Sequence, residues 1–267
     1  MSTVSRSLLF VPGDRLERFE KAASSGAHEV IIDLEDAVAP SAKSQAREAV
    51  SSLFEAGQSA TLRINAADTD WFEDDIQLLK QCPGATVMLA KAEADSIRRL
   101  SSCLPDTSVI ALIETVRGFM ELRRLTSVEG VSRLAFGSID FSVDSGIADE
   151  DDAMTAVRTK IVLESCFAGL LAPADGVSVN YKDQEKMQSD AARSRQLGFG
   201  GKLCIHPKQV VEVNAAYCPS SDKVDWAQRV LSAFETSRGG VTTVDGKMVD
   251  KPVVLEAQNI IAEASRY

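Results

Sequence analysis

The chain has 267 residues, 45% hydrophobic and 25% charged, which suits one large soluble domain or two ordinary ones. Its formal net charge of -10 argues against broad binding to nucleic acid or anionic membranes, although a local arginine cluster can still hold one anion. With only two histidines, a multi-histidine metal site is excluded, so any bound metal is expected to be a hard cation held by oxygen.

Short apolar segments alternate regularly with amphipathic ones. Strands are expected at Ser7–Val11, Glu29–Leu34, Ala60–Asn65, Thr86–Ala90, Ser108–Ile113, Arg133–Phe136, Gly176–Val179 and Lys202–Ile205. Helices are expected at Asp14–Ser24, Ala42–Glu55, Trp71–Gln81, Asp95–Ser102, Arg117–Thr126, Asp151–Gly169, Asp183–Leu197 and Pro207–Tyr217. Eight strand–helix repeats predict a (β/α)8 TIM barrel. A doubly wound open sheet is the alternative, but no GxGxxG opens a helix after the first strand.

The pattern changes after about Pro219. A long amphipathic helix is expected at Ser221–Ser237, followed by the break Gly239-Gly240 and a polar strand-like segment, VTTVDGKMV, with Asp-Gly turn chemistry. A last helix is expected at Val253–Ala264. We therefore divide the chain into a barrel domain, residues 1–219, and a C-terminal extension, residues 220–267. The extension is poorly explained as part of a closed barrel, which favours packing on a neighbouring subunit.

Charged side chains follow several expected strands at their carboxyl ends, where TIM barrels carry their active sites. Strand two leads into the DLED cluster of Asp33, Glu35 and Asp36, which needs compensating positive charge beside a buried strand. Arg63 lies near the end of strand three and Lys91 at the end of strand four, and they are the expected partners together with a divalent cation.

Two further carboxylates, Glu114 and Asp140, follow the neighbouring strands five and six. Mg²⁺ takes one or two carboxylates and leaves positions for water and substrate oxygens, so this pair is a candidate metal site. The alternative is that Glu114 caps the next helix and Asp140 starts a loop. Arg63 can grip a substrate carboxylate through two hydrogen bonds or form an internal ion pair with Glu35 or Asp36, and both can hold together.

The order of motifs along the chain resembles one enzyme family. RSLLFVPG, DLEDAV, LRIN, LAKAE, LIET, FGSIDF and GFGGKLCIHPKQ occur in the sequence of the citrate lyase beta-subunit-like proteins, which belong to the wider malyl-CoA lyase and pyruvate-type TIM-barrel superfamily. Each motif alone is weak, but seven in order cover nearly the whole chain. Ala90, where proline is frequent, and Ser138-Ile139, where the family often has a Gly-x-Glu-Asp pattern, depart from it and leave substrate preference open.

The resemblance implies a Mg²⁺-dependent carbon–carbon lyase acting on acyl thioesters. It assigns the metal to Glu114 and Asp140, and the substrate carboxylate to Arg63. Further substrate-binding residues would be Glu35, Asp36 and Lys91 in the pocket, and Pro12, Gly13 and Arg15 against coenzyme A. The C-terminal extension would act as a lid, whose Asp250 reaches the active site of an adjacent subunit as an acid–base group. On the residues alone, Asp250 is a helix N-cap before Lys251-Pro252.

The expected reaction is reversible Claisen chemistry on a 3-hydroxyacyl-CoA such as citramalyl-CoA or malyl-CoA, with acetyl-CoA and pyruvate or glyoxylate as products. Two alternatives remain: a citrate lyase beta subunit that works in a multisubunit complex, and a catalytically silent barrel that binds a ligand. As its relatives are, the protein is expected to be a homo-oligomer, a trimer or hexamer. Five cysteines without CxxC spacing or a signal sequence favour reduced thiols and a cytoplasmic location.

Overall fold

A computed structural model describes residues 4–150, 152–237 and 240–265. The chain divides into two compact units, with Val4–Asn214 in the larger and the chain from Ala215 onward in the smaller. Asp151 and Gly239, which belong to elements expected from the sequence, lie outside the described residues. None of the described helices is both long and apolar enough to cross a membrane.

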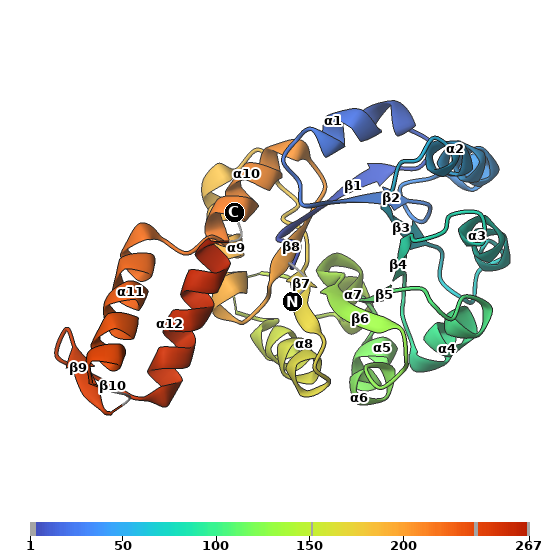
Figure 1. Ribbon diagram of the computed structural model, residues 1–267. Helices are drawn as coiled ribbons and strands as arrows, with labels where there is room; N and C mark the ends of the chain where they lie inside the picture. The colour runs from blue at the N-terminus through green and yellow to red at the C-terminus, as the bar shows by residue number, and fades with distance from the viewer. Residues whose placement is uncertain (1–3, 151, 238–239, 266–267) are drawn as a thin grey trace. The chain divides into compact units, whose positions relative to one another are not determined.

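The larger unit is a closed barrel of eight parallel strands in sequence order, surrounded by helices (Figure 1). Its strands are β1 Ser7–Pro12, β2 Glu29–Asp33, β3 Thr61–Ile64, β4 Thr86–Leu89, β5 Val109–Ile113, β6 Val131–Phe136, β7 Leu171–Asp175 and β8 Gly201–Cys204. Its α-helices are α1 Phe19–Ala23, α2 Lys43–Glu55, α3 Phe72–Leu79, α4 Ala94–Cys103, α5 Val116–Met120, α6 Leu122–Leu125, α7 Ser138–Ser145, α8 Thr155–Phe167, α9 Gln184–Gln196 and α10 Pro207–Ala216. Two 3-10 helices, η1 Leu16–Arg18 and η2 Pro40–Ala42, precede α1 and α2. The predicted TIM barrel is confirmed.

The seventh strand is not where the sequence pattern predicts it. The pattern favours Gly176–Val179, but β7 is the preceding segment LAPAD. Proline lacks the N–H that a central strand donates, which argues against such a segment. Here Arg133 pairs with Leu171 and Ala135 with Ala174, so β7 has one extra residue and the register shifts around Pro173. The bulge accommodates the proline.

Two helical regions also differ from expectation. The expected helix Arg117–Thr126 is divided into α5 and α6, and α7 forms in a segment for which the sequence pattern predicts no helix. The α7 sequence SIDFSVDS has few strong helix formers, so its propensity is low. Tertiary packing supports it instead: Phe141 is 2% exposed, with its ring centroid 5.5 Å from that of Phe136.

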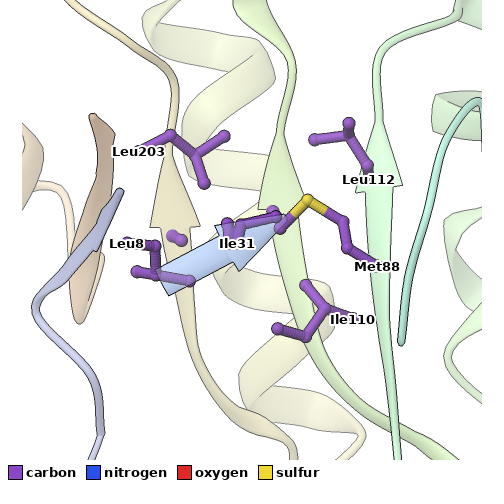
Figure 2. Close-up of a cluster of buried hydrophobic side chains, with 8 residues drawn as sticks. Leu8, Ile31, Met88, Ile110, Leu112 and Leu203 are labelled. Atoms are coloured by element: carbon purple, nitrogen blue, oxygen red, sulfur yellow. The ribbon is translucent and has the colours of Figure 1, made fainter. Parts of the chain in front are cut away.

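The barrel interior is filled by apolar side chains from most of its strands. Figure 2 shows Leu8, Ile31, Met88, Ile110, Leu112 and Leu203 facing one another, and all of them are at most 3% exposed. Because side chains alternate along a strand, residues two positions further on lie on the same inner face. Asp33 and Glu114 follow Ile31 and Leu112 in this way. The alternation that fills the core therefore also carries charged groups to the mouth of the barrel.

The smaller unit consists of two helices and a β-hairpin. These are α11 Ser221–Thr236, β9 Thr242–Val244, β10 Lys247–Val249 and α12 Lys251–Ala264. Asp245 and Gly246 connect the strands with φ of 51° and 75°, the left-handed pair that tight hairpins require, so the predicted Asp-Gly turn is confirmed. Ala227, Val230, Val249, Val254 and Ala257 form the buried core of this unit.

Candidate active site

A cavity of about 280 Å³ lies at the carboxyl ends of the barrel strands. Six charged or loop residues singled out from the sequence contribute to its wall. They are Pro12, Asp33, Asp36, Arg63, Glu114 and Asp140. Phe10, Leu112, Phe136 and Leu203 provide apolar surface. Charged groups from β2, β3, β5 and the α7 turn thus meet around one small space, with an apolar floor.

Arg63 is held mainly by Asp33, its register partner across β2 and β3. The Arg63 Nε and Nη2 atoms donate to the two Asp33 carboxylate oxygens at 2.7 and 2.6 Å. Arg63 Nη1 lies 3.2 Å from Glu35 Oε2, and the guanidinium covers the Phe10 ring at 4.7 Å. The expected ion pair with Glu35 is present, Asp36 takes no part in it, and Asp33, not Asp36, is the second partner.

The pairing leaves Arg63 with unused donors. A guanidinium has five N–H groups, and only those on Nε and one on Nη2 are given to Asp33. Even with one Nη1 hydrogen directed at Glu35, one N–H remains on each terminal nitrogen. The side chain is 12% exposed and lines the cavity. Arg63 can therefore offer a two-pronged end to a carboxylate while Asp33 holds its other edge.

Glu35 and Lys91 form a second ion pair at 2.9 Å between Oε1 and Nζ. The Lys91 backbone N–H donates to Glu114 Oε1 at 2.8 Å, so one residue contacts two carboxylates. Lys91 has φ of 46°, a conformation that is unfavourable for residues with a side chain. Gly13 and Arg15 do not line the cavity, and Arg15 is an exposed residue. The positive charge that compensates Asp33 and Glu35 comes from Arg63 and Lys91.

Glu114 is 2% exposed, and burial raises its pKa to about 8, with the Glu35 carboxylate adding to the shift. Asp140 adds a smaller contribution in the same direction, while Arg63 and the Lys91 N–H oppose it. Glu114 does not cap α5, because the Thr115 hydroxyl accepts from the Gly118 N–H at 3.0 Å and serves as the N-cap. The alternative interpretation of Glu114 as a cap is wrong.

The two carboxylates fit a hard divalent cation. Glu114 Oε2 has no hydrogen-bond partner among the described residues, and Asp140 lies in the first turn of α7 on the wall of the same cavity. No group of three or more His, Cys, Asp or Glu side chains in the described part of the chain could hold a metal. Mg²⁺ suits the pair of Glu114 and Asp140, because it accepts two carboxylates and completes its shell with water and substrate oxygens. A cation would also favour the ionised form of Glu114, against the burial and the Glu35 repulsion that raise its pKa.

Sequence reasoning missed two residues around the site. Gly137 lies where a Cβ would stand 2.5 Å from Glu114 Cβ and 2.7 Å from Glu114 Oε2. Lys43, buried at the start of α2, binds the backbone of the DLED cluster through its ammonium group. Gly137 belongs to the FGSIDF motif and Lys43 follows DLEDAV, but the sequence assigns neither a role, because a glycine in a turn and a lysine at a helix start have many ordinary explanations. The rings of His206 and Tyr181 stack with their centroids 4.3 Å apart, and His206 does not line the cavity.

Residues 6–207 match the family model described as HpcH/HpaI aldolase/citrate lyase. The chain belongs to this family. The resemblance inferred from the seven motifs is thereby confirmed.

Related proteins match this chain over almost its whole length. A citrate lyase subunit beta-like protein of Mycobacterium tuberculosis is 36% identical over 96% of this chain and 94% of its own. A (3S)-malyl-CoA thioesterase of Cereibacter sphaeroides is 30% identical over 97% and 94%. Among solved structures, protein CitE from M. tuberculosis, in complex with magnesium, acetoacetate and coenzyme A, has a TM-score of 0.87 and 34% identity, with 98% of each chain covered. Members of the family are thus named both as lyase-related proteins and as thioesterases.

Proposed function

We propose that the protein is a Mg²⁺-dependent carbon–carbon lyase that cleaves a 3-hydroxyacyl-CoA with a carboxylate on its carbinol carbon, such as malyl-CoA or citramalyl-CoA. The observation that carries this proposal is the joint presence of Glu114, Asp140 and the two free Arg63 donors around one cavity. A carboxylate grip beside a metal site suits an α-hydroxy acid. The CitE complex that contains magnesium and coenzyme A supports both the metal and the thioester.

The size of the cavity supports the view that only one end of the substrate is enclosed. Pockets that enclose drug-sized ligands measure roughly 300–1,000 Å³, and this one measures about 280 Å³. It suits the small hydroxy-acid end and leaves coenzyme A outside. We assign the start of that outer path to Pro12, which lines the cavity, and to the loop through Gly13 and Arg15 that follows it.

Cleavage breaks the bond between the carbinol carbon and the methylene next to the thioester. The hydroxyl loses its proton and becomes the carbonyl of a 2-keto acid, and the electron pair of the broken bond passes to the acetyl-CoA enolate, which then takes up a proton. Arg63 would hold the carboxylate, and Glu114 and Asp140 would hold Mg²⁺. When bound, the cation supplies Lewis-acid stabilisation of negative charge on oxygen.

We assign the proton transfers to Asp250. In the described unit Asp250 Oδ1 accepts from the Val253 N–H at 3.4 Å and caps α12, as the residues alone predict. A carboxylate that caps a helix keeps a second oxygen available. General acid–base help of this kind contributes roughly 10²–10⁴-fold.

The test is product analysis with the full chain, with and without Mg²⁺, on malyl-CoA, citramalyl-CoA and citrate. A lyase releases acetyl-CoA and a 2-keto acid, whereas a thioesterase, the activity named for the C. sphaeroides relative, releases free coenzyme A thiol. Turnover of citrate only with added partner subunits would indicate a citrate lyase beta subunit. If the protein turns over none of the three substrates, the alternative of a catalytically silent, ligand-binding barrel is favoured.

Matched variants test the metal assignment. Glu114→Gln and Asp140→Asn should remove Mg²⁺-dependent turnover without unfolding the protein. Asp144→Asn is the control, because Asp144 lies one turn further along α7 and accepts from the Val116 N–H at 2.6 Å, away from the cavity wall. Wild-type activity of either metal variant at low Mg²⁺ would contradict the assignment.

A further inference from the structure

Lys43, the first residue of α2, is a buried lysine whose donors are all in use. It is 4% exposed, which is rare for lysine. Its Nζ donates to the Leu34 carbonyl at 2.8 Å, the Glu35 carbonyl at 3.0 Å and Asn65 Oδ1 at 2.8 Å. An ammonium group has three N–H donors, so three acceptors satisfy it completely. Lys43 therefore has no donor left for a substrate and acts through the residues that it contacts.

Two of the three acceptors belong to the backbone that carries Glu35. This segment follows β2, where the strand has ended and its carbonyl groups need other donors. Asn65 Nδ2 also donates to the Leu34 carbonyl at 3.0 Å, so Lys43 and Asn65 hold the same peptide from two sides. The side chain of Glu35 then points at the two site cations, Arg63 Nη1 and Lys91 Nζ.

We propose that Lys43 is a positioning residue for the active site. It fixes the backbone of Leu34 and Glu35, so that Glu35 meets the terminal nitrogen of Arg63 and directs the Arg63 N–H groups that remain free toward the cavity. Asp33 holds one edge of the guanidinium and Glu35 the next, and together they leave only the substrate-facing end free. This inference extends the proposed function, because it adds a residue that sets the carboxylate grip from outside the cavity.

The same network offers a matched control in Arg47, one helical turn after Lys43. Arg47 Nη1 lies 3.2 Å from Asp75 Oδ1, and Asp75 Oδ2 accepts from Asn65 Nδ2 at 2.6 Å. Apart from the helix that both residues share, the Arg47 side chain is linked to the Lys43 ammonium through Asp75 and Asn65, and it has no described hydrogen bond or ion pair with residues 34 or 35. Its loss should disturb the helix packing and leave the Glu35 backbone in place.

The first measurement is hydrogen exchange in Lys43→Met and Arg47→Met, made on the full chain without substrate. The Glu35 and Ala37 N–H groups donate to the two Asp33 oxygens at 2.9 and 3.1 Å and report on this segment. We expect exchange at these amides to accelerate at least ~10-fold in Lys43→Met and to stay unchanged in Arg47→Met, since local opening sets the exchange rate. Unchanged exchange in Lys43→Met would overturn the proposal.

The second measurement is the kinetics of malyl-CoA and citramalyl-CoA cleavage. A purely structural role lowers the active fraction and hence the apparent kcat, whereas a misdirected Arg63 raises KM. We expect Lys43→Met to raise KM at least ~10-fold, the scale of a lost charge-assisted hydrogen bond, with KM unchanged in Arg47→Met. If Lys43→Met instead lowers kcat and the active fraction while KM stays at the wild-type value, Lys43 only stabilises the fold and the proposal is wrong.

Lys43→Arg keeps the test decisive if Lys43→Met does not fold. The planar guanidinium retains the charge but cannot direct three donors at three converging oxygens. We expect the same rise in exchange and in KM, and wild-type values of both would overturn the proposal. If the wild-type protein cleaves neither thioester, the proposed function has failed, and hydrogen exchange alone still decides whether Lys43 holds the Glu35 segment.

Discussion

Gly137→Ala is the smallest change that should disable the metal site without touching a charged group. Gly137 has φ of -87°, so alanine is compatible with the backbone there. The added Cβ would stand 2.5 Å from Glu114 Cβ, whereas ordinary contact begins at 3.4 Å, so about 0.9 Å must be gained. Glu114 is buried and tied to the Lys91 N–H, which makes that movement costly.

Two magnitudes follow from this geometry. Overpacking a buried site by one methyl group costs about 1–3 kcal/mol of folding free energy. A misplacement of about 1 Å at a reacting centre costs about 10²-fold in rate. Gly137→Ala should therefore remain folded at room temperature, lose about two orders of magnitude in turnover, and need more Mg²⁺ for half-maximal activity.

The assay is acetyl-CoA release as a function of Mg²⁺ concentration, together with thermal unfolding. Gly146→Ala is the control, since Gly146 ends α7 with φ of 73° and a Cβ added there would have no atom within 4 Å. That variant should lose about 1–2 kcal/mol of stability through backbone strain alone and keep its Mg²⁺ dependence. If Gly137→Ala kept wild-type turnover and Mg²⁺ dependence, Glu114 would not be the metal ligand that we infer.

Three further predictions concern the carboxylate grip, the lid and assembly. Arg63→Lys should not recover the activity lost in Arg63→Ala, because a point charge cannot reproduce a fork that binds Asp33 and a substrate together; equal kcat/KM of Arg63→Lys and wild type would exclude this role. Asp250→Asn should lower turnover at least ~10²-fold with little change in Mg²⁺ affinity, and mixing it with Glu114→Gln should restore activity through hybrid oligomers. If subunits exchange and no activity returns, Asp250 acts in its own subunit or only caps α12. Light scattering should give a trimer or hexamer, consistent with the exposed apolar Met120 and Val143, and a monomer at micromolar concentration would refute assembly.

Local sequence signals are enough to predict the barrel and most of the site. Eight apolar segments at regular spacing leave little choice of architecture, because parallel strands must be covered by the helices between them. Charged residues at the end of a buried segment, or shortly after it, must lie at the carboxyl-end mouth, which is why Arg63, Glu114 and Asp140 can be singled out from the sequence alone. The Asp-Gly hairpin turn and the Asp250 cap are equally local and equally predictable.

The position of β7 and the partners within the site depend on tertiary contacts. Pro173 argues against a strand in any local interpretation, and only the bulge against β6 makes it acceptable. Whether Asp33 or Asp36 pairs with Arg63 depends on strand register, since a shift of one residue turns a side chain to the other face. Lys43 and Gly137 matter through contacts with Asn65 and Glu114, which belong to other strand–helix units, and such contacts exist only once neighbouring strands have paired.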